Sequence, residues 1–136
     1  RGANPFVRAA AYSGRAEWFA EANAEAAVLL MIEGDSALKQ MHEIIATPDL
    51  DGIFIGPMDL SHALGVPGET GHERVVAAIG TVIDACAAAG VTSGIFAGTP
   101  EAARRWIDRG VTLAGVGVDT AILMAALRQV VTAARG

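Results

Sequence analysis

Acidic side chains follow three apolar segments of the chain, and they are the residues best suited to chemistry. Glu33 ends the segment Val-Leu-Leu-Met-Ile-Glu, Asp59 follows Ile-Phe-Ile-Gly-Pro-Met, and Asp119 ends Val-Gly-Val-Asp. Carboxyl ends of parallel strands meet at one edge of a sheet, where ligands of such proteins bind. Carboxylate oxygens suit Mg²⁺ or Mn²⁺, which keep coordination positions for substrate and water. The pattern therefore predicts a divalent metal site.

The alternative is that these acids only begin helices. An acid placed just after a strand is often an N-cap, so Asp59 could cap a helix over residues 60–64. Asp119 could cap the final helix in the same way, and for this residue we favour the cap. Glu33 is a poor capping residue, which favours the pair Glu33 and Asp59 as metal ligands.

The turn Gly56-Pro57-Met58-Asp59 adds a second element to this site. Glycine lets the backbone approach a ligand closely, and a short helix starting near Met58 would present free N–H groups to an anion. A metal beside such amides could bind a 2-oxo acid, with the keto and carboxylate oxygens on the metal. An ordinary proline turn is the alternative.

Other reactive residues are weaker candidates. Lys39, the only lysine, lies on the polar side of a predicted helix, so a Schiff-base mechanism has no credible residue. His62 is close enough to Asp59 to support it, although a surface position is the simpler interpretation. The histidines are spaced in no compact metal motif: His42, His62 and His72.

Composition restricts the class of protein. The chain has 136 residues, 52% of them hydrophobic and 18% charged, which is typical of one globular domain. A formal net charge of −5 argues against nucleic acid and anionic membranes as partners. No apolar run is long enough to cross a bilayer. The single cysteine, Cys86, falls among apolar helix positions and fits a reducing cytoplasm.

Four strands and several helices are expected to position these residues. The strands are short runs of nearly continuous hydrophobicity, as in parallel strands covered on both faces: residues 28–33, 52–57, 93–98 and 113–119. Apolar stripes predict helices over residues 37–45, over residues 75–86 before Gly90, and from about Thr120 onward. Thr99-Pro100 begins a further helix that ends at Gly110, with Trp106 and Ile107 facing inward. Helical stretches are also expected from Asn4-Pro5 toward Tyr12 and around Trp18.

This alternation of strands and helices predicts an α/β protein with a parallel sheet. Two architectures fit it, a small doubly wound sheet or part of a (β/α)₈ barrel. A complete barrel needs about 250 residues, and only four strands are present here. Periodicity alone does not separate the two.

A family resemblance favours the barrel. The segment Asp-Gly-Ile-Phe-Ile-Gly-Pro-Met-Asp-Leu-Ser over residues 51–61, followed by Leu64-Gly65, resembles the signature of the 2-oxo-acid aldolase and citrate lyase β-subunit-like family. The nearest members are the 4-hydroxy-2-oxoheptanedioate and 2-keto-3-deoxy sugar-acid aldolases. Ile32-Glu33, Arg1-Gly2 and the segment at residues 116–119 follow the family's order and spacing, so the resemblance covers nearly the whole chain.

The resemblance implies that residues 1–136 are a single partial domain. This domain would be the C-terminal half, about four βα units, of a (β/α)₈ TIM barrel of the phosphoenolpyruvate/pyruvate type. It also implies a homo-oligomer, often a trimer of dimers, with Mg²⁺, Mn²⁺ or Co²⁺ held by Glu33 and Asp59. The substrate would contact Met31, Gly56 and Pro57, and amides around Met58 and Asp59 would bind the pyruvate carboxylate. The implied reaction is class II cleavage of 4-hydroxy-2-oxo acids to pyruvate and an aldehyde.

Two departures from the family pattern change what we expect. Met31 stands where the aldolases often have glutamine, and methionine cannot donate that hydrogen bond. The family's catalytic histidine and oxo-binding arginine lie on earlier strands, ahead of Arg1, so this chain would carry the metal half of the site and be inactive alone. We expect it to self-associate or to need an N-terminal partner.

Two other functions remain open at this stage. One is an acyl-CoA lyase or hydrolase of the citrate lyase β type, for which few basic residues are available. The other is a non-catalytic α/β assembly module, in which Glu33 and Asp59 only cap helices.

Overall fold

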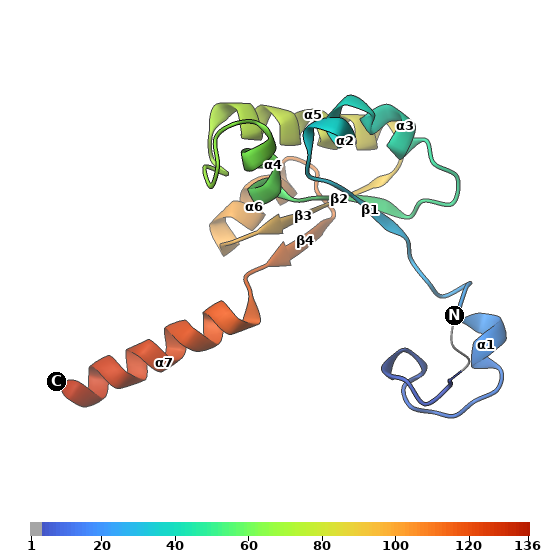
Figure 1. The fold of residues 1–136 in the computed structure, drawn as a ribbon, viewed down its shortest axis with the longest axis horizontal. Helices are drawn as coiled ribbons and strands as arrows, with labels where there is room; N and C mark the ends of the chain where they lie inside the picture. Colours follow the sequence, from blue (N-terminus) through green and yellow to red (C-terminus); the bar gives the residue numbers. More distant parts are fainter. Residues whose placement is uncertain (1–3) are drawn as a thin grey trace.

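The computed structural model describes residues 4–136, and the Arg1-Gly2 pair of the family resemblance lies outside this range. Its centre is a four-stranded sheet in which all neighbours are parallel (Figure 1). The strands are, in chain order, β1 (Leu29–Ile32), β2 (Gly52–Ile55), β3 (Thr92–Ala97) and β4 (Leu113–Val116). Each lies within one residue of the predicted start, which confirms the four predicted strands.

The order of the strands separates the two predicted architectures. The sheet runs β1-β2-β3-β4, so that each strand pairs with the next one along the chain. In a doubly wound sheet the order of the strands reverses at a switch point, whereas the strands of a (β/α)₈ barrel follow one another around the barrel in chain order. The register places Met31, Phe54, Gly94 and Leu113 side by side across the four strands. The topology is therefore that of a segment of a barrel wall.

Helices follow every strand. Their bounds are α2 (Asp35–Lys39), α3 (Met41–Ile45), α4 (Pro57–Ala63), α5 (Glu73–Ala89), α6 (Pro100–Asp108) and α7 (Asp119–Arg135). Before the sheet, residues 4–27 contain the 3₁₀ helix η1 (Arg8–Ala10) and the short helix α1 (Trp18–Glu21). Helices α2 to α5 lie along one face of the sheet, whereas α7 and the N-terminal segment extend away on the other side (Figure 1).

One face of the sheet carries the hydrophobic core. Ile53, Ile55 and Ile95 have no exposed surface and pack in the same cluster as Ile79 and Val82 of α5. The opposite face is open within the described residues, with large apolar side chains exposed: Leu29, Met31, Phe96 and Leu113. The expectation that the strands are covered on both faces is therefore wrong for this chain, because its helices cover one face only. An open inner face is what half of a barrel presents.

The inner face is shaped by Phe54 and two glycines. A Cβ added to Gly94 would lie 2.8 Å from the Phe54 ring, and one added to Gly115 would lie 3.6 Å from it. The ring therefore extends from β2 across β3 to β4, over positions that have no side chain. Gly94 is required at this place by close approach, since a larger residue would displace the ring.

Several predicted boundaries differ from the observed ones. The stripe over residues 37–45 is two helices, α2 and α3, that meet at Gln40, whose φ of −104° and ψ of 11° are not helical. The second strand ends at Ile55 rather than residue 57, because Gly56 and Pro57 begin α4. The fourth strand stops at Val116, and the next residue, Gly117, has a φ of +72° that ends extended pairing.

Helix α6 begins where the sequence predicts. The Thr99 hydroxyl accepts a hydrogen bond from the Ala102 amide at 3.2 Å, and Pro100 is the first helical residue. Trp106 is buried, as predicted, but Ile107 is 53% exposed, so the inward orientation expected for Ile107 is wrong. Successive side chains of an α-helix point about 100° apart, so when Trp106 faces the core, Ile107 points toward solvent.

Removing this cap is expected to weaken the fold. Thr99→Ala should lower the free energy of unfolding by about 1 kcal/mol, because the N-terminal amides of α6 lose their acceptor. Urea unfolding of the protein that carries this chain measures the change. Thr81→Ala is the matched control, since the hydroxyl of Thr81, on the exposed side of α5, only donates to the Ala77 carbonyl and alanine is the better helix former there. Equal losses for the two variants would contradict the capping role.

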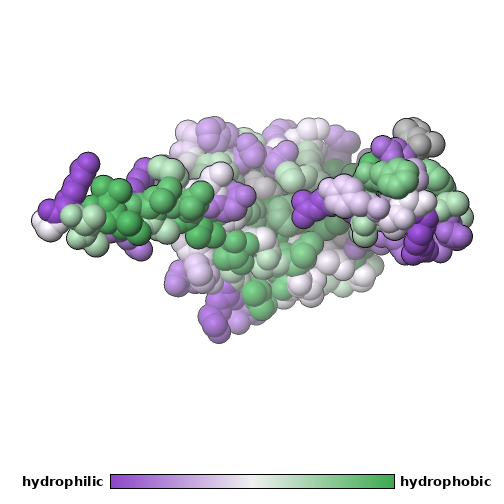
Figure 2. Space-filling view, turned by 90° about the horizontal axis from the view of Figure 1, so that it is seen from below, coloured by the Kyte–Doolittle hydropathy of each residue, from purple (hydrophilic) through white to green (hydrophobic). Residues whose placement is uncertain are grey.

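Helix α7 packs against nothing within the described residues. It has no buried residue, and its apolar side chains are exposed along its length, as the green atoms of the projecting helix in Figure 2 show. The predicted apolar stripe of this helix is thus present but unpartnered: Ile122, Leu123, Leu127 and Val130.

Across residues 4–136, no helix combines the length and the apolar character that crossing a bilayer requires.

Candidate functional site

The carboxylate of Glu33 lies against the backbone of the next strand. Glu33 follows β1, and Gly56 follows β2, the neighbouring strand. A Cβ placed on Gly56 would lie 2.9 Å from Glu33 Oε2 and 3.0 Å from Glu33 Cβ. The missing side chain of Gly56 therefore makes the space in which this carboxylate lies. Glu33 is half-buried, and Gly34 rather than Glu33 is the N-cap of α2.

Asp59 belongs to the first turn of α4, three residues after Gly56. Gly56 is the N-cap of this helix and Pro57 its first residue, so Asp59 does not cap it. The predicted alternative of a helix capped by Asp59 is therefore wrong, and the exposed carboxylate is left available. Glu33 and Asp59 follow adjacent strands at the same edge of the sheet, as the metal-site prediction requires.

Asp119, the third acid, has a different environment. It is the first residue of α7, and its Oδ1 accepts a hydrogen bond from the Thr120 amide at 2.7 Å. The N-cap of α7 is Val118, so Asp119 is not the predicted cap. Its carboxylate lies in the first turn instead, where a negative charge stabilises the helix N-terminus. The local role we favoured for Asp119 is otherwise consistent with this hydrogen bond.

The turn between β2 and α4 exposes backbone amides at the same edge. The first amide of α4 that donates to a carbonyl of this turn is that of Leu60, which bonds Gly56 O at 3.0 Å. The amides of Met58 and Asp59 precede it, in the turn where helical N–H groups have no intrahelical acceptor. The helix begins one residue earlier than the predicted start near Met58. An anion placed there would meet these amides and the positive end of a short helix.

Two further residues of the signature hold this turn and its strand in place. The Ser61 hydroxyl, which is buried, donates to Met58 O at 2.6 Å and accepts from the Gly68 amide at 2.9 Å. It thereby ties the loop after α4 to the turn that carries Asp59. At the opposite edge, Asp51 Oδ2 accepts from the Val28 amide at 2.6 Å, which fixes the start of the β1–β2 pair. The sequence predicts none of these three bonds.

Met31 lies on the same face of β1 as Glu33, two residues before it. Its side chain is 50% exposed, and its sulfur would lie 3.7 Å from a Cβ on Gly56. The structure therefore brings all the predicted site residues to one edge: Met31, Glu33, Gly56, Pro57, Met58 and Asp59. A thioether is only a weak acceptor, so Met31 offers apolar contact at this position.

The remaining reactive side chains lie elsewhere. Lys39 forms an exposed ion pair with Asp35, and Cys86 is buried in the core, where loss of water raises the pKa of its thiol. His72 caps α5 by accepting from the Arg74 amide, and His62 is exposed at the end of α4. Across residues 4–136, no three side chains of the His, Cys, Asp and Glu types converge on a metal-sized position.

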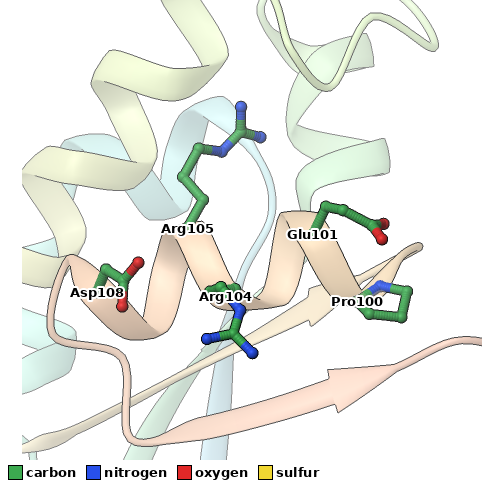
Figure 3. Close-up of a pocket in the computed structure, with 5 residues that line it drawn as sticks. All are labelled: Pro100, Glu101, Arg104, Arg105 and Asp108. Atoms are coloured by element: carbon green, nitrogen blue, oxygen red, sulfur yellow. The ribbon is translucent and has the colours of Figure 1, made fainter.

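Two hollows adjoin α6, and the sequence indicates neither. A shallow one of about 510 Å³ follows the exposed side of the helix and is lined by α6 residues of both charges (Figure 3): Pro100, Glu101, Arg104, Arg105 and Asp108. A smaller, more enclosed pocket of about 130 Å³ lies between the end of β3, α6 and the α4 turn. It shares Pro57 and Met58 with the candidate site, so it is the hollow that bears on chemistry.

Comparison with known proteins identifies the family of the chain. Residues 4–134 match the family described as HpcH/HpaI aldolase/citrate lyase. The chain is 37% identical to a hydroxypyruvate/pyruvate aldolase of Pseudomonas aeruginosa over 123 residues, which are 90% of this chain and 46% of that protein. It is 38% identical to a 2-keto-3-deoxy-L-rhamnonate aldolase of Escherichia coli O6:K15:H31, over 95% of this chain and 49% of that protein.

A solved structure gives the same result for the fold. The crystal structure of a family protein from Burkholderia cenocepacia J2315 matches with a TM-score of 0.84 and 38% identity, over 100% of this chain and 53% of that chain. The chain thus spans about half the length of the relatives it matches, and the expected half of a (β/α)₈ barrel is confirmed. The chain belongs to the HpcH/HpaI aldolase/citrate lyase family.

Proposed function

We propose that the protein that carries this chain is a divalent-metal-dependent aldolase that cleaves 4-hydroxy-2-oxo acids to pyruvate and an aldehyde. The observation that carries the proposal is the carboxylate of Glu33 lying over Gly56, next to the turn that bears Asp59. Membership of the family and the names of its aldolase relatives support the reaction type.

The two carboxylates fit a hard divalent cation. Glu33 and Asp59 supply oxygen ligands, and the missing side chain of Gly56 makes the space in which the Glu33 carboxylate lies. Mg²⁺ or Mn²⁺ held by one or two protein carboxylates retains positions for water and substrate, and Co²⁺ is compatible with the same ligands. When bound, the cation would draw electron density from the 2-oxo group and so ease cleavage of the C3–C4 bond.

The chain's own groups would hold the substrate in place. The amides of Met58 and Asp59 would donate to its carboxylate, assisted by the N-terminus of α4. Gly56 and Pro57 would let the substrate approach the backbone, and Met31 would contact its carbon chain. Proton transfer is assigned to residues outside these 136, since none of the histidines here lies in this turn or on the strand ends.

We also include assembly and location in the proposal. Association with another chain would cover the exposed apolar side chains of the unpartnered α7, whereas the open inner face of the sheet would meet the remaining strands of the barrel. The proposed assembly is a cytoplasmic homo-oligomer, in the form of a trimer of dimers.

The test is metal-dependent release of pyruvate. The protein that carries this chain is freed of metal with EDTA and supplied with a panel of 4-hydroxy-2-oxo acids, with lactate dehydrogenase and NADH reporting pyruvate. We expect turnover only after Mg²⁺, Mn²⁺ or Co²⁺ is added. Full turnover in EDTA would contradict the metal role, and hydrolysis of an acyl-CoA without pyruvate release would favour the lyase or hydrolase alternative.

A further inference from the structure

The 130 Å³ pocket beside the α4 turn combines an apolar interior with a cationic rim. Phe96 of β3 and Trp106 of α6 form its interior together with Met58, and Trp106 is only 5% exposed. Thr70 and Arg105 contribute the polar groups. The pocket is large enough for a short carbon chain with one polar end.

Arg105 is the charged group of this pocket. Its guanidinium lies 5.2 Å from the centre of the Trp106 ring, a cation–π contact that orients its donors. No carboxylate lies within 4.0 Å of it in the described part of the chain, where the ion-paired arginines are Arg15 and Arg109. Figure 3 shows Arg105 extending from α6 on the side of α4, while its neighbour Arg104 extends on the opposite side.

The position of the pocket relates it to the substrate. Pro57 and Met58 line the pocket and also form the turn that carries Asp59. Phe96 is on the inner face of the sheet, like Met31 and Glu33, because the neighbouring Ile95 and Ala97 are buried on the helix side. A substrate held at the α4 turn would therefore extend its far end along Met58 and Phe96 toward the guanidinium.

We propose that this pocket selects the aldehyde half of the substrate, and that Arg105 is a specificity-determining residue for an acidic group at its far end. This inference rests on the proposed aldolase function for its substrate. The apolar interior suits a short methylene chain, and an arginine without a carboxylate partner suits a terminal carboxylate, which it can bind through two parallel hydrogen bonds.

The kinetic test compares two 4-hydroxy-2-oxo acids of equal length, one ending in a carboxylate and the other in a hydroxymethyl group. In Arg105→Met, we expect kcat/KM for the acidic substrate to fall about tenfold, mainly through KM, because one charge-assisted contact is lost. The neutral substrate should change less than about twofold. Arg105→Lys should keep part of the preference, and Arg104→Met, the matched control, should keep all of it. An equal effect of Arg105→Met on both substrates would overturn the proposal.

A binding test does not depend on turnover. The chain has two tryptophans, so in a Trp18→Phe background the emission reports Trp106 in the pocket. Titration with glutarate, without metal, should give a saturable change in emission that Arg105→Met abolishes and Arg104→Met retains. If neither substrate releases pyruvate, the aldolase proposal fails, while the glutarate titration still decides the pocket: a response unchanged in Arg105→Met would overturn it.

Discussion

Glu33→Gln is expected to abolish metal-dependent pyruvate release from the protein that carries this chain. Glutamine keeps the size of the side chain over Gly56 but removes the negative charge that holds a cation. Even residues that only orient metal ligands cost about 10- to 100-fold when changed, so loss of a ligand should exceed about a hundredfold. Isothermal titration with Mn²⁺ should show the same loss of affinity in the absence of substrate.

Asp35→Asn is the matched control for this variant. Asp35 is also an acid just after β1, but its carboxylate pairs with Lys39 on the exposed side of α2. We expect Mn²⁺ affinity and turnover to remain within about twofold of the original protein, because exposed pairs of this kind contribute little. If Glu33→Gln and Asp35→Asn bound Mn²⁺ equally well, Glu33 would not be a metal ligand.

Gly56→Ala is the second large effect that we expect, and it acts through Glu33. The new methyl group would lie 2.9 Å from Glu33 Oε2 and 3.0 Å from its Cβ, so the carboxylate must turn away. The backbone tolerates alanine, since the φ of Gly56 is −101°. Mn²⁺ affinity should therefore fall about 10- to 100-fold. Because Glu33 Cβ cannot move by side-chain rotation, the free energy of unfolding should also fall, by about 1–3 kcal/mol.

Gly34→Ala controls for the loss of a glycine beside Glu33. A Cβ on Gly34 would meet no atom within 4 Å, and its φ of −141° is ordinary extended backbone. Its Mn²⁺ affinity should match that of the original protein. The space that Gly56 provides would have no role in metal binding if Gly56→Ala also kept full affinity and full turnover.

The fold was largely predictable because its strands differ sharply from their surroundings in hydrophobicity. Each strand is a short apolar run, and its position follows from composition alone. The predictions that were wrong concern features that depend on tertiary contacts. The apolar stripe continues through Gln40, so periodicity could not indicate the break between α2 and α3. Ile107 has the composition of a core residue, yet α6 presents only Trp106 to the core.

The candidate site was predictable to a similar degree. The segment around Asp59 could be recognised because it is a contiguous motif, and Glu33 because it ends a strand. The approach of Glu33 to Gly56 could not be predicted, since it depends on the register between two strands. Phe96 carries a signal that could have been used: it alternates with Gly94 and Gly98, which marks the inner face of β3. Arg105 carries none.

The order of the sheet also has a consequence for biosynthesis. Because each strand pairs with the one made just before it, the wall of the barrel can grow strand by strand as the chain leaves the ribosome. The Phe54 ring, which covers Gly94 and Gly115 of the two later strands, would be a template for this growth. A nascent chain that halts after β2 would leave this ring uncovered, so stalled translation there should recruit chaperones more strongly than a stall after β4.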